Sequence, residues 1–458
     1  MSMYSQGSGV SWLRHLLDTG VGRVHFAGVM GVSVSSLAQA LAARGFYVSG
    51  SDSSLFGGVS VLEGVDTLTP PEVSVRSADA LVYSLAVPED SVERRVAREY
   101  GVPEFCRSEL LGAMMLSYER RLGVSGTHGK STTTAMLASV FSSCGASPTV
   151  FCGAEMQGGR RYILGGEKYF IYEACEYRDS FLHFSPTCAI LTNIELDHTD
   201  YFSGTDALVD SFVRSVAAAE RVIVSSDSPL VDCVARRVGD RCVGCGRDSG
   251  REYRYLPISS GLEGSKFRLL HRGRDLGEFS TRVQGIHNIA NAAIAASAAL
   301  SEGVEPDAVR RGLECFFGIG GRMELIGHIG VLSVYRDYAH HPTEIRASIE
   351  TLRASYGRVA VIFKPHTYTR TRDLWDGFVS SLSLADSVGI CEIFAARERS
   401  IDGVCSEALA ASIGNAEFLG DTDVLRYALS IKEGALVLMG AGDLGAALDG
   451  IGKIINGG

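Results

Sequence analysis

Short runs of consecutive apolar residues recur along the chain, each followed by glycines or polar residues and then by a helix-forming stretch. The clearest runs are residues 24–27, 80–84, 169–172, 188–191, 359–363 and 436–439. Continuous apolar runs of this length are typical of parallel strands buried on both faces. Because they alternate with helical stretches, the sequence predicts an α/β protein built on mostly parallel sheets.

The length of 458 residues corresponds to roughly three domains. The order of strands and helices predicts one sheet in each of them. We place the domains at residues 1–117, 118–317 and 318–458. Glycines at 318, 320 and 321 interrupt the pattern before the last domain and are the predicted hinge.

The segment 125–131 (SGTHGKS) follows apolar residues and precedes a helix-forming run. A strand, a glycine loop, Lys-Ser and a helix form the arrangement that binds polyphosphates through backbone N–H groups and the helix N-terminus. Lys130 is placed to reach the outer phosphates and the Ser131 hydroxyl to bind Mg²⁺. Val124 stands where the strict pattern has glycine, so this is a variant P-loop. The alternative is a turn that merely starts a helix, but it does not explain why Lys and Ser follow the glycine loop.

The first domain begins with a β-α-β unit, since strands at 24–27 and 47–52 flank a helix at 33–44. The second strand ends in Asp52, about where a dinucleotide fold binds a ribose. Met30, however, occupies the position of the second glycine in the G-x-G-x-x-G pattern. This substitution argues against a nicotinamide or flavin dehydrogenase and leaves a related nucleotide-like ligand.

Three polar residues of the second domain follow apolar strands: Glu173 follows the run at 169–172, and Asn193 and His198 lie in the segment 192–198 that follows the run at 188–191. Ligand-binding groups collect beyond the carboxyl ends of parallel strands, so we expect all three to share a crevice with the P-loop. Metal or phosphate chemistry follows from that placement. Taken singly, Glu173 could equally be a solvated strand end, and His198 a loop histidine.

Two later features add polar groups. Asn288 and Asn291 lie three residues apart on one face of a predicted helix, which suits recognition of a purine edge or a phosphate. N-capping explains one of them but not both. In the third domain, residues 337–342 and 364–372 carry histidines, a lysine and arginines at what we expect to be adjacent strand ends. They predict a cationic pocket, with the nucleotide held between the second and third sheets.

Composition limits the alternatives. The formal net charge of −10 argues against a general nucleic-acid or membrane-surface binder. No run of 18 apolar residues and no signal peptide are evident. The 11 cysteines are irregularly spaced, and Cys242 and Cys245 form only a lone C-x-x-C pair, a weak sign of metal or redox chemistry. These features favour a reducing cytoplasm.

Taken together, the motifs resemble those of the Mur ligases of peptidoglycan synthesis, over nearly the whole chain from residue 23. The segments that carry the resemblance are 125–131 (SGTHGKS), 172–177 (YEACEY), 192–198 (TNIELDH), 337–344 (DYAHHPTE) and 365–371 (PHTYTRT). The last two are similar to segments of the alanine-adding member. The resemblance implies a Rossmann-like N-terminal domain that binds the UDP-sugar, a P-loop ATPase-like central domain that binds ATP, and a Rossmann-like C-terminal domain.

The implied reaction uses ATP and Mg²⁺ to join L-alanine to the lactyl carboxylate of UDP-N-acetylmuramic acid through an acyl phosphate. The residues implied in catalysis are Lys130, Glu173, His198, Asn288, Asn291, Arg322 and Asp337. Those implied in nucleotide binding are Gly126, Thr127, His128, Gly129, Lys130, Ser131, Thr132, Asn291 and Asp337. Those implied in substrate binding are Gly28, Gly31, Asp52, Ser84, His340 and Arg370. The implied Mg²⁺ ligands are Ser131, Glu173 and His198.

The sequence also departs from the family pattern. Met30, Ser33 and Ser36 replace glycines of the N-terminal turn, Arg336 replaces an Asp, and Gly321 replaces an Arg. Two alternatives therefore stay open: a sister ligase that adds a peptide or another amino acid to the same sugar nucleotide, and a non-catalytic paralogue that only binds nucleotides. A P-loop transport or signalling ATPase would not explain the polar sets of the third domain. The chain is expected to be a monomer or a homodimer without nucleic-acid or membrane partners.

Overall fold

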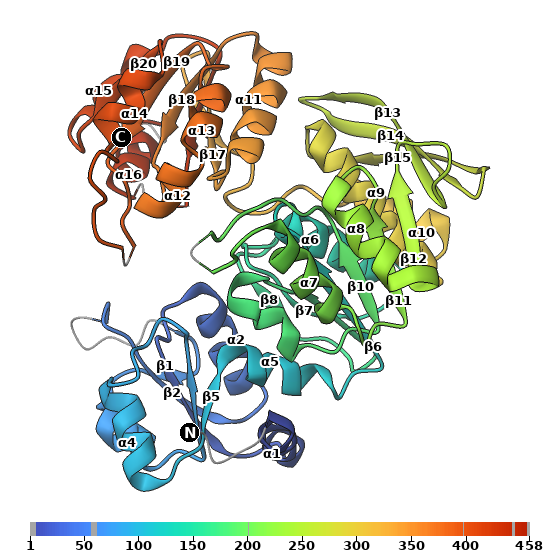
Figure 1. The fold of residues 1–458 in the computed structure, drawn as a ribbon, viewed down its shortest axis with the longest axis vertical. Coiled ribbons are helices and arrows are strands. Elements are labelled where there is room, and N and C mark those ends of the chain that lie inside the picture. Colours follow the sequence, from blue (N-terminus) through green and yellow to red (C-terminus); the bar gives the residue numbers. More distant parts are fainter. Residues whose placement is uncertain (1–5, 56–61, 200, 397, 442–444, 456–458) are drawn as a thin grey trace.

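The computed structural model describes residues 6–55, 62–199, 201–396, 398–441 and 445–455. They form three sheets, one after another along the chain, and each is covered by its own helices (Figure 1). The central sheet lies between the N-terminal one and the C-terminal one. The prediction of an α/β protein with three mostly parallel sheets is therefore confirmed. None of the helices in these ranges is long and apolar enough to cross a membrane.

The N-terminal sheet has five parallel strands in the order β3-β2-β1-β4-β5. Its elements are α1 (Gln6–Thr19), β1 (Arg23–Ala27), α2 (Val32–Ala43), β2 (Tyr47–Ser51), β3 (Val65–Asp66), α3 (Pro71–Arg76), β4 (Ala80–Tyr83), α4 (Val92–Tyr100), β5 (Glu104–Cys106) and α5 (Arg107–Met115). The chain builds outward from β1 in one direction and then returns to add β4 and β5 on its other side. The end of β1 is thus a switch point of the topology, where ligands bind in such sheets.

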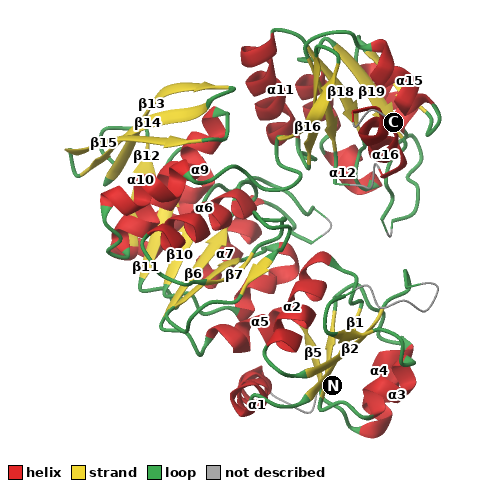
Figure 2. Cartoon of the chain, turned by 180° about the vertical axis from the view of Figure 1, so that it is seen from behind, coloured by secondary structure: helices red, strands yellow, loops and turns green. Residues whose placement is uncertain are grey.

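The central sheet has ten strands in the order β15-β14-β13-β12-β11-β10-β6-β9-β7-β8 (Figure 2). Its strands are β6 (Arg120–Ser125), β7 (Thr149–Phe151), β8 (Tyr162–Ile163), β9 (Tyr169–Glu173), β10 (Cys188–Leu191), β11 (Arg221–Ser225), β12 (Cys242–Gly246), β13 (Tyr253–Gly261), β14 (Gly264–His271) and β15 (Arg274–Thr281). Its helices are α6 (Lys130–Ser143), η1 (Tyr177–His183), α7 (Thr205–Ser215), α8 (Pro229–Val238), η2 (Gly239–Arg241), α9 (Ile286–Ser301) and α10 (Pro306–Glu314). Because β6 runs parallel to its neighbours β9 and β10, the segments after all three strands emerge at one edge.

The C-terminal sheet has six strands in the order β16-β17-β21-β18-β19-β20. Its elements are β16 (Glu324–Ile329), β17 (Leu332–Asp337), α11 (Pro342–Tyr356), β18 (Val359–Phe363), α12 (Tyr368–Asp373), α13 (Trp375–Leu382), β19 (Ser387–Cys391), α14 (Ser406–Ser412), β20 (Ala416–Leu419), α15 (Asp423–Ser430), β21 (Ala435–Met439) and α16 (Gly445–Ile455). The two polar segments follow β17 and β18, which we expected to be adjacent. That expectation is wrong, because β21 lies between them and pairs with both.

Two parts of the central sheet have weak sequence signals. Helix α8 and strand β12 are short segments of mixed composition, which give weak periodicity. The charged stretch at 247–282 forms a meander, since β13, β14 and β15 pair antiparallel.

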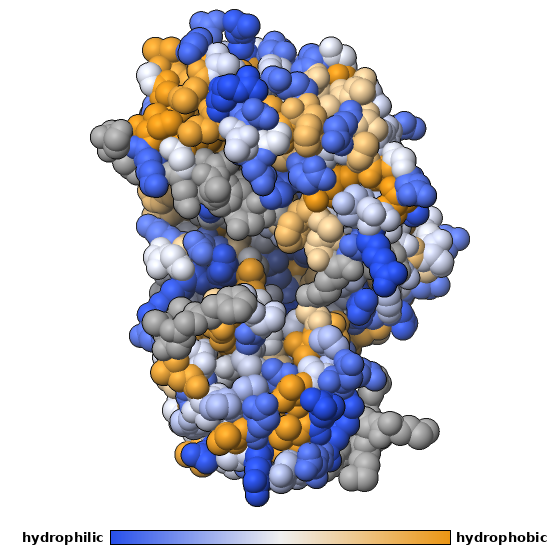
Figure 3. All heavy atoms as spheres, turned by 90° about the vertical axis from the view of Figure 1, so that its left-hand side faces the viewer, coloured by the Kyte–Doolittle hydropathy of each residue, from blue (hydrophilic) through white to orange (hydrophobic). Residues whose placement is uncertain are grey.

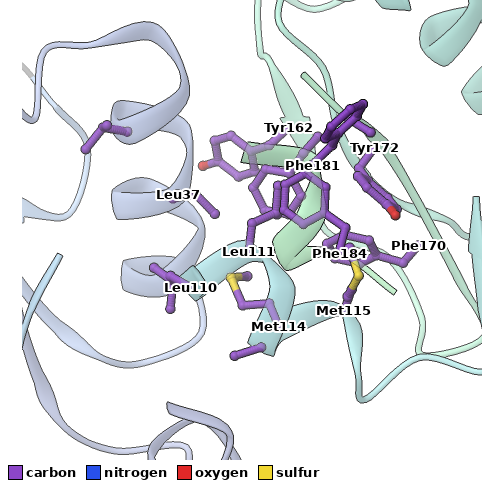
Figure 4. Packing of buried hydrophobic residues seen from close by; sticks show 14 of the residues in the cluster. Leu37, Leu110, Leu111, Met114, Met115, Tyr162, Phe170, Tyr172, Phe181 and Phe184 are labelled. Atoms are coloured by element: carbon purple, nitrogen blue, oxygen red, sulfur yellow. The ribbon is translucent and has the colours of Figure 1, made fainter. Parts of the chain in front are cut away.

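The N-terminal and central domains share a hydrophobic core. Helix α5 packs its apolar side chains between Leu37 of α2 and a group of aromatic rings of the central domain (Figure 4). The side chains of this contact are Leu110, Leu111, Met114, Met115, Tyr162, Phe170, Tyr172, Phe181 and Phe184. Fully burying one such side chain contributes about 1.5–3 kcal/mol, so these two domains are firmly joined.

The C-terminal domain has its own core. Among the described residues, both hydrophobic clusters of this domain consist entirely of residues after position 322. Its contacts with the central domain include hydrogen bonds and ion pairs. Figure 3 shows a hollow in the surface between the upper and lower parts of the molecule. Polar contacts of this kind separate more readily than a packed core, so this is the domain that can move.

Candidate active site

The P-loop lies at the edge where β6 ends. Gly126 and Gly129 have φ of +136° and +78°, and a Cβ at either would collide with the side chain of Thr192 or Asn291. Asn193 fixes the loop through two hydrogen bonds with the His128 backbone. Its Oδ1 accepts a hydrogen bond from the His128 amide at 2.8 Å, and its Nδ2 donates one to the His128 carbonyl at 2.9 Å. The glycines are thus needed for both their backbone angles and the close packing behind the loop.

Lys130 begins α6, and its buried ammonium group turns back into the loop. It donates to the Thr127 carbonyl at 3.0 Å and to both Glu176 oxygens at 3.1 and 3.2 Å. Burial alone lowers the pKa of Lys130, but the Glu176 carboxylate outweighs it and raises that pKa. Lys130 is therefore a permanent cation whose present counter-ion is a carboxylate.

Ser131 and Glu173 flank one buried thiol. The Cys152 Sγ lies 3.5 Å from the Ser131 carbonyl and 3.4 Å from Glu173 Oε1, which also accepts the Gly153 amide. A hydroxyl and a carboxylate beside a polyphosphate loop form the donor set that Mg²⁺ prefers. The structure therefore brings Ser131 and Glu173 to the same thiol beside the P-loop.

His198 completes this edge of the central sheet. Its Nε2 lies 3.9 Å from Glu176 Oε1 and 3.9 Å from Asp197 Oδ2, and its ring packs against Tyr177 at 4.6 Å between centroids. Because Glu176 also holds Lys130, the structure brings His198 and Lys130 to the same carboxylate. His198 therefore lies at the P-loop edge, next to the carboxylate that binds Lys130.

A cavity of about 330 Å³ opens from the P-loop toward the C-terminal domain. The predicted site residues that line it are His128, Gly129, Ser131, Thr132, Asn288, Asn291, Arg322 and Asp337. Asn291 donates to Asn288 Oδ1 at 3.2 Å, so both amides do share one face of α9. The volume is in the range of small-molecule sites, and its walls come from two domains.

The C-terminal wall carries a buried acid, Asp337, and a partly buried cation, Arg322. Burial raises the pKa of Asp337 to about 6, although Ser348 and Arg322 oppose this shift. The Arg322 guanidinium lies 3.4 Å from Glu344 and its carbon 5.0 Å from the centroid of the Tyr338 ring. Burial lowers the pKa of Arg322, but Glu344, Asp337 and other acidic groups together outweigh burial and raise it, so this cation stays charged beside the cavity.

Glu344 also joins the two domains. His128 Nδ1 of the P-loop lies 3.1 Å from Glu344 Oε1, and His128 Nε2 lies 3.5 Å from Glu195 Oε2. The Thr343 hydroxyl of α11 donates to the same Glu195 oxygen at 2.6 Å. Burial lowers the pKa of His128, but the two carboxylates outweigh burial and raise it. A buried polar network therefore closes this side of the cavity.

A second ion pair joins the domains. Arg370 of α12 donates to Asp197 through Nε at 3.1 Å and through Nη2 at 3.0 and 3.2 Å, and its Nη1 lies 3.0 Å from His366. His340 Nδ1 lies 3.4 Å from Glu344. Arg370, His366 and His340 thus lie near one another, but Arg370 faces one carboxylate and His340 another, so the expected positive charge is partly neutralised.

The predicted residues of the N-terminal domain meet at the switch point of its sheet. A Cβ on Gly28 would lie 3.2 Å from the Ser84 Cβ, and the Gly31 amide donates to the Gly28 carbonyl at 3.1 Å. Asp52 accepts the Met30 amide at 3.1 Å. The Asp52 carboxylate thus holds the β1–α2 turn, which the sequence did not indicate.

The sequence reasoning missed four carboxylates: Glu176, Glu195, Asp197 and Glu344. Each lies inside a segment that was already singled out for its polar residues. Their partners are cations or histidines distant in sequence, so only the fold shows what each acid does.

Arg336, which the sequence suggested could influence specificity, does not line the cavity. It lies 3.0 Å from Glu324 across the β16–β17 pair. Its Nε and Nη2 each lie 3.8 Å from where a Cβ of Gly321 would be. The two departures from the family pattern are therefore neighbours, and a guanidinium occupies the space beside the glycine.

Fold and site together define a P-loop enzyme whose nucleotide cavity is completed by a third, separately packed domain. Three family models match the chain in order: the Mur ligase family catalytic domain at 23–119, the Mur ligase middle domain at 124–299, and the Mur ligase glutamate ligase domain at 321–442. The chain belongs to the Mur ligase family of ATP-dependent, amide-bond-forming ligases.

Relatives named UDP-N-acetylmuramate–L-alanine ligase are similar over most of their length. The Acetivibrio thermocellus protein is 36% identical over 441 residues, which are 92% of this chain and 93% of the relative. The Solibacter usitatus protein is 35% identical over 444 residues, again 92% and 93%.

Solved structures show the same three-domain arrangement. The UDP-N-acetylmuramate-alanine ligase MurC of Thermotoga maritima has a TM-score of 0.78 and 26% identity, covering 93% of this chain and 97% of that one. The murein peptide ligase mpl of Psychrobacter arcticus has a TM-score of 0.71 at 23% identity, covering 95% and 99%, and shows a shared fold.

Proposed function

We propose that this protein joins L-alanine to the lactyl carboxylate of UDP-N-acetylmuramic acid in peptidoglycan precursor synthesis. The carboxylate takes the γ-phosphoryl group of ATP, which leaves ADP and an acyl phosphate. The amine of alanine then attacks the acyl carbon, forms the amide and releases phosphate. The observation that carries this proposal is the interdomain cavity, which is lined by Ser131 and other P-loop residues on one side and by Arg322 and Asp337 of the C-terminal domain on the other.

The chain must bring two anions together, so its cations have to offset their repulsion. Lys130 is charged and buried in the loop, and it would exchange the Glu176 carboxylate for the outer phosphates of ATP. Ser131 and Glu173 would hold one Mg²⁺ and His198 a second, and bound Mg²⁺ neutralises phosphate charge.

The remaining residues position the substrates. We assign Asn288, Asn291, Arg322 and Asp337 to the nucleotide and the acyl phosphate, because all four line the cavity. The main-chain N–H groups of the P-loop segment Gly126–Thr132 would hold the phosphates of ATP.

We assign the carboxylate of alanine to His340 and Arg370. Arg370 already binds a carboxylate in two-point fashion, since Asp197 occupies its guanidinium. Alanine would take the place of that acid. In the N-terminal domain, Gly28, Gly31, Asp52 and Ser84 would receive the uridine-diphosphate end, in line with their place at the switch point.

The same proposal assigns residues 1–117 to UDP-sugar binding, 118–317 to ATP binding, and 318–458 to amino-acid binding and closure, in a cytoplasmic monomer or homodimer. Closure of the last domain would keep water from the acyl phosphate. Its separate core and polar contacts with the central domain support this motion.

The test is ADP release by the purified protein with ATP, Mg²⁺, UDP-N-acetylmuramic acid and L-alanine. Release should require all of these components. Lys130→Ala should reduce it by about 10³-fold, by analogy with removing one charge-stabilising group from a transition state. Lys168→Ala is the matched control, because Lys168 is exposed and lies outside the cavity. Absence of ADP release from the wild-type protein would refute the proposal.

An amino-acid and peptide panel in the same assay separates alanine addition from the sister activities. Arg336→Ala should leave the preferred amino acid unchanged, because Arg336 faces Glu324 and does not line the cavity. Binding of both nucleotides without turnover would instead indicate a non-catalytic paralogue.

A further inference from the structure

A second group of metal-binding side chains lies beside the P-loop, apart from the proposed magnesium ligands. One ring nitrogen of His128, one of His341 and one carboxylate oxygen of Glu195 all lie within 4.8 Å of one another. We propose that these three side chains form a site for a transition-metal ion of the Zn²⁺ type, which links the central and C-terminal domains.

The distances suit such an ion. His128 Nε2 lies 3.5 Å and His341 Nδ1 3.6 Å from Glu195 Oε2. A tetrahedral ion with bonds of about 2.0–2.1 Å separates its ligands by roughly 3.4 Å. The two imidazole rings lie 4.7 Å apart between centroids and are tilted by 45°, so both can face one ion. Small side-chain rotations therefore complete the site.

The surroundings also support a metal site. His128 Nε2 is buried and makes no hydrogen bond with any described residue. The other nitrogen of the same ring lies 3.1 Å from Glu344 Oε1. A histidine whose second nitrogen is held by a carboxylate is the arrangement found around protein-bound zinc, where the acid fixes the ring. Glu195 is held by the Thr343 hydroxyl at 2.6 Å.

Two contacts compete with the ion. The Thr343 amide donates to His341 Nδ1 at 3.3 Å, a long bond that a metal ion would replace. A proton on His128 can also satisfy Glu195 and Glu344 without metal. The metal ion must displace both the Thr343 hydrogen bond and the His128 proton, which lowers its affinity. Ion pairing of protonated His128 without metal is therefore the competing outcome.

The donor set determines the class of ion. Two imidazoles and one carboxylate, with a fourth position left open, are typical ligands of Zn²⁺ and related transition metals. Mg²⁺ prefers oxygen ligands and is not expected here. His128 and Glu195 come from the central domain and line the nucleotide cavity, whereas His341 directly precedes α11. A bound ion would therefore join the two domains and stabilise the closed arrangement beside the cavity.

The experiment uses Co²⁺ as a spectroscopic probe on the full-length protein without nucleotide or substrate. We expect the visible absorption of four-coordinate Co²⁺ at one ion per chain, displaced by Zn²⁺ but not by excess Mg²⁺. His341→Asn and Glu195→Gln should each weaken Co²⁺ binding by at least about 10-fold, as should Glu344→Gln through the His128 ring. His328→Asn is the matched control, since His328 lies on β16 of the same domain and contacts Ser333.

Three results would overturn the proposal: no stoichiometric Co²⁺ binding, a thiolate charge-transfer band that assigns the ion to cysteine, or unchanged affinity in the His341 and Glu195 variants. Unfolding midpoints of the metal-free variants establish that each is folded, and the variants lie on different domains, so either can decide alone. Because ATP and sugar nucleotide are absent, the result is independent of the ADP-release assay.

Discussion

Replacing Asp197 by asparagine should open the cleft between the central and C-terminal domains. Asp197 and Arg370 lie on opposite sides of that cleft, and their side chains are 9% and 11% exposed. Three N–H···O contacts of 3.0 to 3.2 Å join them, so the pair is desolvated and well aligned. Asparagine keeps the size of the side chain and the acceptor for the His198 amide but removes the charge.

Removing one partner of a buried ion pair costs about 3–5 kcal/mol. For Asp197→Asn we use the lower end of this range, a loss of about 3 kcal/mol from the stability of the closed arrangement. The lower value applies because Arg370 keeps its contact with His366 and becomes hydrated again once the domains part. Since about 1.4 kcal/mol is a factor of ten, the ratio of closed to open molecules should fall roughly 10²-fold. The fold of each domain should be unaffected, because the pair acts only across the cleft.

Small-angle X-ray scattering of the ligand-free protein measures this change. The wild-type protein should scatter as the compact arrangement, and Asp197→Asn should give a larger radius of gyration. The matched control is Asp240→Asn, since Asp240 is exposed on the central domain. If the Asp197 variant scattered like wild type while keeping its unfolding midpoint, the ion pair would not be what holds the domains together.

Two further predictions concern the P-loop and the cavity wall. Gly126→Ala should abolish ADP release by more than about 100-fold, because its methyl group would collide with the side chain behind the loop, whereas Gly452→Ala, whose methyl group meets nothing, should retain it. The pKa of Asp337 is about 6 in the folded protein, against an ordinary value of 3.8. Between these two pH values the folded protein binds a proton at Asp337 that the unfolded chain does not, so the free energy of unfolding falls as pH rises through that window. Asp337→Asn should remove this fall and raise the free energy of unfolding at neutral pH by about 2–3 kcal/mol. Urea unfolding at about pH 4 and about pH 7 measures it, and a variant that kept the wild-type pH dependence would contradict the shift.

Much of the site could be predicted from the sequence because its signals are local. The spacing in SGTHGKS specifies glycine angles, a cation and a helix start within one segment, and the structure has all three there. Glu173 is the last residue of β9 and His198 lies in the loop after β10, so the parallel arrangement brings both toward the P-loop edge. The core strands were equally clear, since runs buried on both faces need no partner to be recognised.

What only the tertiary structure decided is the pairing of charges across long distances in the chain. The sequence could not order β17, β21 and β18, because the residues of a parallel strand do not specify which strands pair with it. It could not show that Asp197 meets Arg370 or that His128 meets Glu344, since an ion pair depends on distance and burial as well as on residue type. The order of the residues determines the local motifs, whereas the ion pairs between their cationic side chains and distant carboxylates form only once the domains have packed.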